Sequence, residues 1–227
     1  MRCSDLSNSP LPVSADGPED HSALLDVASQ FGLAITSAQA HVLGQYCRLL
    51  WDWNSRLNLT RHTTVELFVT RDLLDSIELA KHLPNGAQVL DVGSGGGVPG
   101  IVLAILRPDL CVSLSESVQK KARVLQDIVQ RLELSVPIHA ERAQATLRTR
   151  RFSHVVIRAV APISELLTWF EPDWISVGEL LLIKGPRWVG EQSAADAAGL
   201  LKRRRLEVVS TWPTPGREHD SVLLRIT

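Results

Sequence analysis

The spacing of apolar residues divides the chain into a helical first part and an alternating second part. Apolar residues recur every three to four positions over 21–31, 37–57 and 65–82, which predicts three amphipathic helices. Thr36 or Ser37 is suited to cap the second of these helices. From residue 88 onward, short β-type runs alternate with helical segments. The expected strands are 88–92, 111–115, 136–139, 153–157 and 179–184, and the expected helices are about 99–106, 118–132, 142–148, 163–175 and 190–204.

This alternation predicts a mostly parallel sheet with helices on both faces. Two further β-type runs, 206–211 and 221–226, follow without a helix between them, which predicts a closing antiparallel hairpin. We expect three regions along the chain. They are a disordered tail over 1–20, rich in Ser, Pro, Asp and Gly, an N-terminal helical region over 21–84 and an α/β domain over 85–227.

The first predicted strand ends in a turn crowded with glycine, from Asp91 to Gly100. Without Cβ atoms, such a turn lets the backbone pass close to a ligand, and the N–H groups of the following helix point into the same space. The dinucleotide fingerprint G-x-G-x-x-G would require glycine at position 98, where Val98 stands. The pattern present is D-x-G-x-G-x-G, which is typical of class I S-adenosyl-L-methionine (SAM) methyltransferases.

Glu116 ends the second predicted strand, where an acidic side chain suits the ribose hydroxyls of an adenosine. The alternative is a purely structural glycine turn with a solvated glutamate. With the glycine turn, Glu116 predicts SAM as the cofactor and a class I SAM-dependent methyltransferase fold. This is an α/β fold with a doubly wound, mostly parallel, seven-stranded Rossmann-like sheet and an N-terminal helical extension.

Charge is distributed unevenly, although the net charge is only −1. Residues 1–116 hold 7 Lys and Arg against 13 Asp and Glu, whereas residues 117–227 hold 17 against 12. A cluster of Lys and Arg side chains can form a face that binds RNA or DNA phosphates. The alternative for any one cluster is that its cations lie at a solvent-exposed helix end. We expect the run Lys202–Arg205 to end a helix, where cations also suit the helix dipole.

The N-terminus lacks the apolar core of a signal peptide, and no apolar run approaches the length of a membrane span. We therefore expect a cytoplasmic protein without a membrane partner, and we expect it to be a monomer. The cysteines and histidines show no metal-ligand spacing, so we expect no metal.

Several short motifs occur in a fixed order from about residue 46 to residue 186. They are Trp53-Asn54-x-x-Leu57-Asn58-Leu59-Thr60, Arg71, Asp75-Ser76, Asp91 through Ile101, Glu116-Ser117-x-x-Lys120-Lys121, Arg142-Ala143, Arg158-Ala159 and Lys184-Gly185-Pro186. In their order and spacing these motifs resemble the RsmG (GidB) family. Its members are bacterial methyltransferases that modify guanine N7 in small-subunit ribosomal RNA. The resemblance implies that this chain has the same activity and binds small-subunit ribosomal RNA or the ribosomal subunit.

The resemblance assigns the family's residue roles to some positions of this chain, but at other positions the chain departs from the family pattern. Gly93 and Val98 fall at loop positions that contact SAM in the family, and Ala143 and Gln144 fall beside the adenine. Gln144 stands in place of the usual Glu, Glu116 in place of the more usual Asp, and Asp72 where the family usually has His. The change at Asp72 removes a possible cation from the mouth of the site. The residues predicted to bind the cofactor are Asp91, Gly93, Gly95, Val98, Glu116, Ala143, Gln144 and Arg158.

Arg158 follows an apolar strand, so we expect it to face the glycine turn and to orient the methionine carboxylate or the target nucleotide. A structural salt bridge is the alternative. Lys184 and Arg187 are predicted to contact RNA, with a solvated strand end as the alternative for Lys184. Asn58 and Arg71 are predicted to cover the pocket or contact RNA. A helix C-cap is the alternative for Asn58, and Asp75 is expected either in the site or paired with Arg71.

Guanine N7 carries a free lone pair and no proton, so methyl transfer needs no general base and we predict no catalytic residue in that sense. Rate should come from positioning and electrostatic support. Two alternatives remain open from the residues alone: a SAM-dependent methyltransferase acting on a small molecule or protein, and a non-catalytic binder associated with the ribosome. Binding of SAM would separate the last of these from the enzymes.

Overall fold

The computed structural model describes residues 19–227, so almost all of the predicted tail lies outside the described residues. The first part is helical, with α1 (Glu19–Gln30), α2 (Ser37–Asn54), α3 (Val65–Leu67), the π-helical turn η2 (Phe68–Leu73) and α4 (Leu74–Ala80). Thr36 caps α2, because its side chain accepts from the N–H of Gln39 while the Gln39 side chain accepts from the N–H of Thr36. The predicted helix over 65–82 is therefore interrupted by a π turn.

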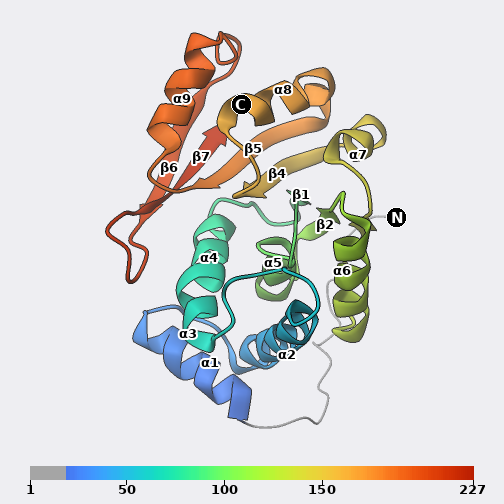
Figure 1. Cartoon of the computed structure of the whole chain (residues 1–227), viewed down its shortest axis with the longest axis vertical. Coiled ribbons are helices and arrows are strands. Elements are labelled where there is room, and N and C mark those ends of the chain that lie inside the picture. Colours follow the sequence, from blue (N-terminus) through green and yellow to red (C-terminus); the bar gives the residue numbers. More distant parts are fainter. Residues whose placement is uncertain (1–18) are drawn as a thin grey trace.

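Seven strands form one sheet with the order β3-β2-β1-β4-β5-β7-β6 (Figure 1). The strands are β1 (Gln88–Val92), β2 (Cys111–Ser115), β3 (Ile138–His139), β4 (Phe152–Arg158), β5 (Val177–Lys184), β6 (Leu206–Trp212) and β7 (Ser221–Ile226). The first five are parallel, and β7 runs antiparallel to both β5 and β6. The predicted doubly wound, mostly parallel sheet with a closing antiparallel hairpin is confirmed.

Alternate residues of the central strands β1, β4 and β5 enter two separate cores, one on each face of the sheet. Val89 and Val156 pack with helices of the first part and with α5 (Gly100–Leu106) and α6 (Gln119–Arg131). Leu90 and Val155 pack with the helices of the other face. Those helices are α7 (Ala143–Thr149), α8 (Ile163–Phe170), which the 3₁₀ helix η3 (Glu171–Ser176) follows, and α9 (Trp188–Ala197).

The N-terminal helices do not have a core of their own. Leu43 of α2 and Leu73 of η2 belong to the same buried cluster as Ile101 and Leu125, which lie in α5 and α6. The helices thus extend one face of the sheet, as Figure 1 shows for α1 to α4 beside α5. The division into regions 21–84 and 85–227 stays a prediction.

The expectation that the run Lys202–Arg205 ends a helix is wrong. Helix α9 ends at Ala197, and Gly199 follows with φ +73°. The N–H of Gly199 donates to the carbonyl of Asp196, and that of Leu200 donates to the carbonyl of Ala195. These two bonds form a Schellman motif, in which the left-handed glycine stops the helix. The basic run therefore lies in turns after the helix rather than on its last turn.

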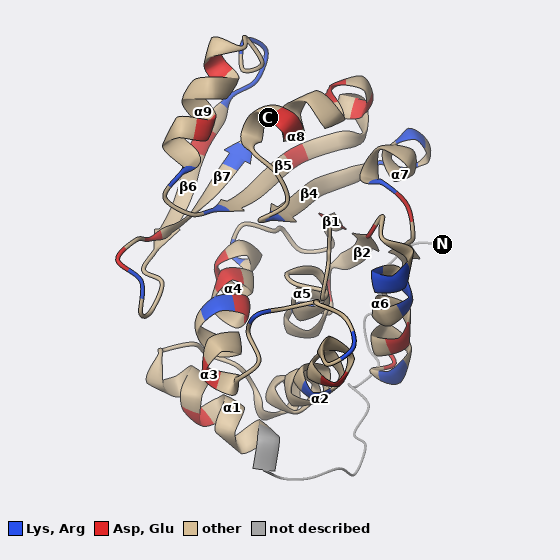
Figure 2. Cartoon of the chain, in the orientation of Figure 1, with Lys and Arg blue, Asp and Glu red and all other residues tan. Residues whose placement is uncertain are grey.

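The basic residues of the second half do not form one face. Arg150 and Arg151 precede β4, and Lys202–Arg205 precede β6, which runs in the same direction as β5. These cations lie at the amino ends of the strands, whereas Arg158 and Lys184 end β4 and β5 at the opposite edge (Figure 2). Within residues 19–227, no helix is both long enough and apolar enough to cross a membrane.

Candidate active site

The sheet has its switch point between β1 and β4. From β1 the chain first builds β2 and β3 on one side, and then returns to build β4 and β5 on the other. A crevice forms at the carboxyl ends of strands at such a point. Val92 pairs with Ile157 in register, so the next residues, Gly93 just after β1 and Arg158 at the end of β4, lie side by side.

The glycine loop after β1 needs its glycines for two different reasons. Gly93 has φ +69°, and a Cβ there would lie 2.7 Å from Val160 Cγ2. Gly100 has ordinary backbone angles, but a Cβ there would lie 2.7 Å from Asp91 Oδ2 and would overlap the Leu114 side chain. Gly93 therefore serves the path of the chain, and Gly100 serves the close packing of α5 on β1 and β2.

Asp91 lies behind this loop rather than in front of it. Its side chain is buried, and Oδ2 accepts a hydrogen bond of 3.0 Å from the N–H of Gly100. Burial raises the pKa of the Asp91 carboxyl to about 7, although the bonds from Gly100 and Ser94 oppose this rise. Asp91 is absent from the residues that line the two cavities described below. Its geometry is that of a support for the loop, and direct contact with a cofactor stays a prediction.

Glu116 also supports the loop. One carboxylate oxygen accepts from the N–H of Gly95 at 3.0 Å, and the other accepts from the N–H of Val118 at 2.7 Å. The side chain is buried and connects the glycine loop to the start of α6. A carboxylate has further lone pairs to offer, so the predicted ribose contact remains compatible with this geometry.

Two cavities meet at the glycine loop, and Gly93 lines both. The smaller cavity has apolar walls and polar edges, and it is lined by Val92, Gly93, Ser115, Ser117, Glu141, Arg142, Ala143, Gln144, Val160 and Trp169. It contains the predicted residues Ala143 and Gln144. Trp169 on α8 and Ser117 after β2 were not anticipated from the sequence.

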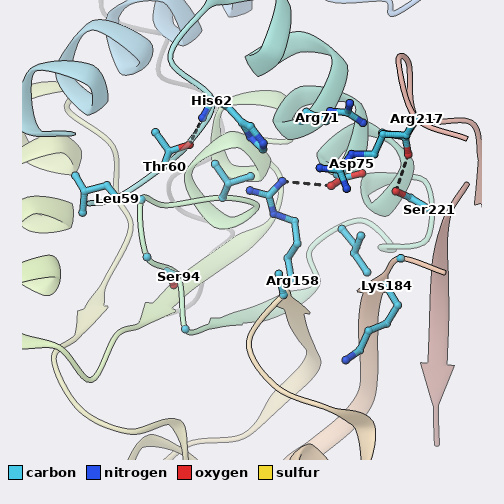
Figure 3. Close-up of a pocket in the computed structure, with 18 of the residues that line it drawn as sticks. Leu59, Thr60, His62, Arg71, Asp75, Ser94, Arg158, Lys184, Arg217 and Ser221 are labelled. Carbon is cyan, nitrogen blue, oxygen red and sulfur yellow. Dashed lines mark hydrogen bonds and ion pairs between the residues drawn. The ribbon is translucent and has the colours of Figure 1, made fainter. Parts of the chain in front are cut away.

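The larger cavity has a volume of about 410 Å³, within the range of small-molecule sites. It lies between the glycine loop, the segment after α2, the start of α4 and the β6–β7 hairpin (Figure 3). The predicted residues Gly93, Gly95, Val98, Arg71, Arg158 and Lys184 all line it. Thr60, His62 and Arg217 line it as well, and the sequence patterns had assigned them no role.

Arg158, whose side chain is 19% exposed, occupies the centre of an ionic cluster with the buried Asp72 and Asp75. Its Nη2 lies 2.7 Å from Asp72 Oδ1, and its Nη1 lies 3.2 Å from Asp75 Oδ2. The same Asp72 oxygen lies 2.9 Å from His62 Nδ1, while Asp75 Oδ1 accepts from the indole N–H of Trp212 at 3.1 Å. We call these five residues the Arg158 cluster. The structural salt bridge, given above as the alternative for Arg158, is therefore present.

Electrostatics favour the charged form of Arg158. Burial acts to lower the pKa of this guanidinium, but Asp72 and Asp75 together outweigh it and the pKa is raised. Burial raises the pKa of the Asp75 carboxyl despite the neighbouring Arg158. The next residue, Ala159, has φ +55°, a left-handed conformation that turns the chain sharply after Arg158. A contact between Arg158 and a ligand stays a prediction.

Lys184 does not end its strand in solvent, so that alternative is wrong. The side chain is buried, and Nζ donates to the carbonyl of Ala161 at 2.6 Å and to Glu191 Oε2 at 2.7 Å. In Figure 3 the ammonium group points away from Arg71 and Asp75. Lys184 thus connects β5 to α9, and its contact with RNA stays a prediction.

Asn58 and Arg187 are exposed, and neither lines the two cavities. The C-cap alternative for Asn58 is wrong, because α2 ends at Asn54 and its C-cap is Ser55. Asn54 has the structural role in this segment, since its Oδ1 accepts from the N–H groups of Leu59 and Thr60. RNA contacts of Asn58 and Arg187 stay predictions.

The residues present fit an adenosine-containing sulfonium cofactor. The glycine loop keeps side-chain bulk away from the junction of the two cavities. In the smaller cavity, Ala143, Val160 and Trp169 offer apolar surface to a purine, while Gln144 and Ser117 offer hydrogen-bonding groups. Among the described residues, no group of three or more His, Cys, Asp or Glu side chains is arranged to hold a metal ion.

Two solved methyltransferases have the architecture of this chain. An O-methyltransferase from Bacillus cereus, solved with SAH, gives a TM-score of 0.58 at 17% identity, covering 89% of this chain and 96% of that one. A precorrin-6y C5,15-methyltransferase from Geobacter metallireducens gives 0.51 at 12% identity, covering 77% and 95%. The fold is therefore the Rossmann-like fold of SAM-dependent methyltransferases.

Sequence comparison places the chain within that class. Residues 39–218 match the GidB family model, which is described as rRNA small subunit methyltransferase G. A ribosomal RNA small subunit methyltransferase G from Rhodopirellula baltica is 50% identical over 184 residues, 81% of this chain and 80% of the relative. One from Sorangium cellulosum is 35% identical over 214 residues, 91% and 89% of the two chains. The chain belongs to the GidB family, as its motifs predicted.

Proposed function

We propose that this protein transfers a methyl group from SAM to N7 of a specific guanine in bacterial small-subunit ribosomal RNA. The observation that carries the proposal is the pair of cavities that meet at Gly93, in a chain of the GidB family. The smaller cavity has the size and lining for an adenosine. The larger cavity is open to a base and lined by cations.

The smaller cavity would hold the adenosine of the cofactor, with Ala143 and Gln144 at the adenine and Ser117 at the ribose. The ribose contact proposed for Glu116 would form between Ser115 and Ser117, which line this cavity on either side of it. The backbone at Gly93, Gly95 and Val98 would pass along the methionine part. Asp91 would keep this loop in shape from behind. Arg158 would lie beside the methionine carboxylate or the incoming nucleotide, because it ends β4 next to Gly93.

When bound, SAM supplies a methyl group on a positively charged sulfur, and transfer breaks the C–S bond as a C–N bond forms at N7, leaving the sulfur neutral. Guanine N7 needs no deprotonation, so no side chain of this protein has to accept a proton. The chain contributes by holding the base in line with the methyl group and by excluding water. The Arg158 cluster fixes the wall of the larger cavity against which the base would lie.

The charge of the larger cavity favours RNA over a small apolar substrate. Arg71, Arg158 and Arg217 line it, and phosphate recognition by guanidinium groups is a recurring feature of nucleic-acid sites. The basic residues at the amino ends of the strands lie at the other edge of the sheet and would not take part.

Incubation of the protein with methyl-labelled SAM and isolated small subunits, naked small-subunit rRNA, or large-subunit rRNA tests the proposal. We expect label in small-subunit RNA alone. Label in protein or small molecules but in no RNA would favour the alternative enzymes. Failure to bind SAM at all would favour a non-catalytic binder.

We further propose that the protein acts as a monomer in the cytoplasm, where ribosomal RNA is found. The helical region 21–84 would serve as one wall of the substrate site of the α/β domain 85–227. Thr60, His62 and Arg71, all from the helical region, line the larger cavity and support this arrangement.

A further inference from the structure

We propose that Arg71 and Arg217 together form a phosphate-binding subsite in the larger cavity. It would hold a backbone phosphate of the RNA beside the target guanine. The inference rests on the proposed function and adds a subsite, a second residue and a ligand group to it.

Arg71 does not form the ion pair with Asp75 that was one of the two alternatives from the sequence. Asp75, one helical turn away, directs its two oxygens to Arg158 and to Trp212 instead. Nη1 of Arg71 is buried and has no hydrogen-bond partner among the described residues. Within residues 21–227, whose side chains the structure describes, no carboxylate lies within 4.0 Å of the Arg71 guanidinium. A buried, unpartnered cationic nitrogen indicates that a ligand completes the site.

Arg217 brings a second positive charge to the same place. Burial lowers the pKa of Arg71, and the charge of Arg217 lowers it further, while only Asp75 opposes them. The fold thus holds two like charges close together at the wall of an open cavity. An anion bound between them would relieve this repulsion and satisfy the free N–H groups. Guanidinium groups bind phosphate through paired N–H···O bonds, which makes phosphate the matching ligand.

The β6–β7 hairpin holds Arg217 in position. Gly216 has φ +69°, the N–H of Arg217 donates to the carbonyl of Thr214 at 3.0 Å, and Thr214 Oγ1 lies 2.9 Å from Ser221 Oγ. Glu218, His219 and Asp220 are exposed in the same loop, and His219 and Asp220 also line the cavity. In the described part of the chain, neither Glu218 nor Asp220 lies within 4.0 Å of the Arg217 guanidinium.

The position of the pair indicates an RNA phosphate rather than the carboxylate of the cofactor. In Figure 3, Arg158 lies between Ser94 of the glycine loop and the Arg71–Arg217 pair. Arg158 is the cation next to Gly93, whereas Arg71 and Arg217 line the part of the larger cavity that η2 and the β6–β7 hairpin form. A nucleotide whose base lies near the glycine loop would extend its phosphate in this direction.

Arg217→Gln and Arg71→Gln test the subsite, with Arg203→Gln as the matched control. Arg203 is exposed at the opposite edge of the sheet, so the control removes the same charge elsewhere. Two binding measurements apply to each protein: the affinity for small-subunit rRNA as a function of salt, and the affinity for S-adenosylhomocysteine. We expect each site variant to weaken RNA binding about tenfold and to reduce the salt slope by about one. The affinity for S-adenosylhomocysteine should change less than twofold, and the control should match the wild type.

A small probe separates the subsite from the proposed function. With S-adenosylhomocysteine bound, the wild type should bind 5′-GMP more tightly than guanosine, and Arg217→Gln should abolish the difference.

Equal binding of GMP and guanosine by the wild type would overturn the subsite, even if the protein methylates ribosomal RNA. A tenfold loss of S-adenosylhomocysteine affinity in Arg217→Gln would also overturn it, by assigning the pair to the cofactor. Absence of rRNA methylation with the GMP preference intact would refute the proposed function alone. Because Arg217 is exposed in a loop, its replacement should leave the melting temperature unchanged.

Discussion

His62 Nδ1 and Asp72 Oδ1 form a hydrogen bond of 2.9 Å at the edge of the larger cavity. The pair joins the segment after α2 to the π turn η2, and through Asp72 it reaches Arg158 at the end of β4. Asp72 departs from the usual family His, and the sequence alone leaves its role open. The structure gives it a role as the common acceptor of a histidine and an arginine. An imidazole also remains at the cavity, contributed by His62.

Asp72→Asn should destabilise the fold markedly. The variant leaves the largely buried Arg158 with only one carboxylate partner and removes the carboxylate that accepts from His62. We expect the free energy of unfolding in urea to fall by about 3 kcal/mol, the scale found when a buried ion pair loses one partner.

Asp52→Asn is the matched control for that change. The Asp52–Arg56 pair is 3.9 Å long, and both side chains are more than 60% exposed, at 62% and 64%. Its removal should cost no more than about 0.5 kcal/mol. Equal losses in the two variants would show that the Arg158 cluster does not stabilise the protein.

Gly100→Ala should be destabilising although its backbone angles suit alanine. A Cβ at this position would overlap the Leu114 side chain and lie 2.9 Å from Asp91 Cβ, both of which are buried. We expect a loss of about 1–3 kcal/mol from overpacking, measured by urea unfolding. A Cβ at Gly190 in α9 would meet nothing within 4 Å, so Gly190→Ala should stabilise by up to about 1 kcal/mol. A harmless Gly100→Ala would mean that α5 does not need this close approach to β1.

Asp91 should make stability depend on pH in an identifiable window. Its pKa rises on folding from 3.8 to about 7, so between these values the folded chain binds more protons than the unfolded chain. Stability from this group is complete below pH 3.8 and falls as the pH rises toward 7. Relative to Asp91→Asn, the free energy of unfolding of the wild type should fall by up to about 1.4 kcal/mol per pH unit between pH 5 and 7, and then level off. Parallel pH profiles of the two proteins would contradict the raised pKa.

Glu116→Gln tests whether the carboxylate supports the cofactor loop. A glutamine amide has one acceptor atom and cannot accept from the N–H groups of both Gly95 and Val118 in the same way. We expect the affinity for S-adenosylhomocysteine, measured by calorimetry, to weaken about tenfold or more, since hydrogen bonds to charged groups contribute about 1.5–3 kcal/mol. Glu165→Gln, an exposed position on α8, should leave the affinity unchanged. An unaffected Glu116→Gln would remove this residue from the cofactor site.

The sequence predicted the sheet and the glycine loop well because their signals are local. Strand and helix periodicity, the Thr36 cap and the glycine turn are each visible within a few residues. The end of α9 was also visible locally, at Gly199, but the apolar residues Leu200 and Leu201 after it extended the apparent helix. The π turn η2 has no comparable signal, because the helical spacing of apolar residues continues through it.

The site was harder to predict because its contacts are distant along the chain. Asp75 was considered as a partner of Arg71, whereas its actual partners include Trp212, 137 residues away. Arg217 lies in the turn of the β6–β7 hairpin, and no local pattern places that turn over the cavity. Lys184 was expected at a strand end, which is correct, but its acceptor Glu191 belongs to the following helix.

The most direct test of the proposed function is the identity and position of the methylated nucleotide. Small subunits treated with the protein and methyl-labelled SAM would be digested, and the labelled nucleoside would be identified and mapped by mass spectrometry. We expect one labelled guanosine, methylated at N7, in small-subunit rRNA. Label on another atom or another base, or no label in that RNA while the protein binds SAM, would contradict the proposed function.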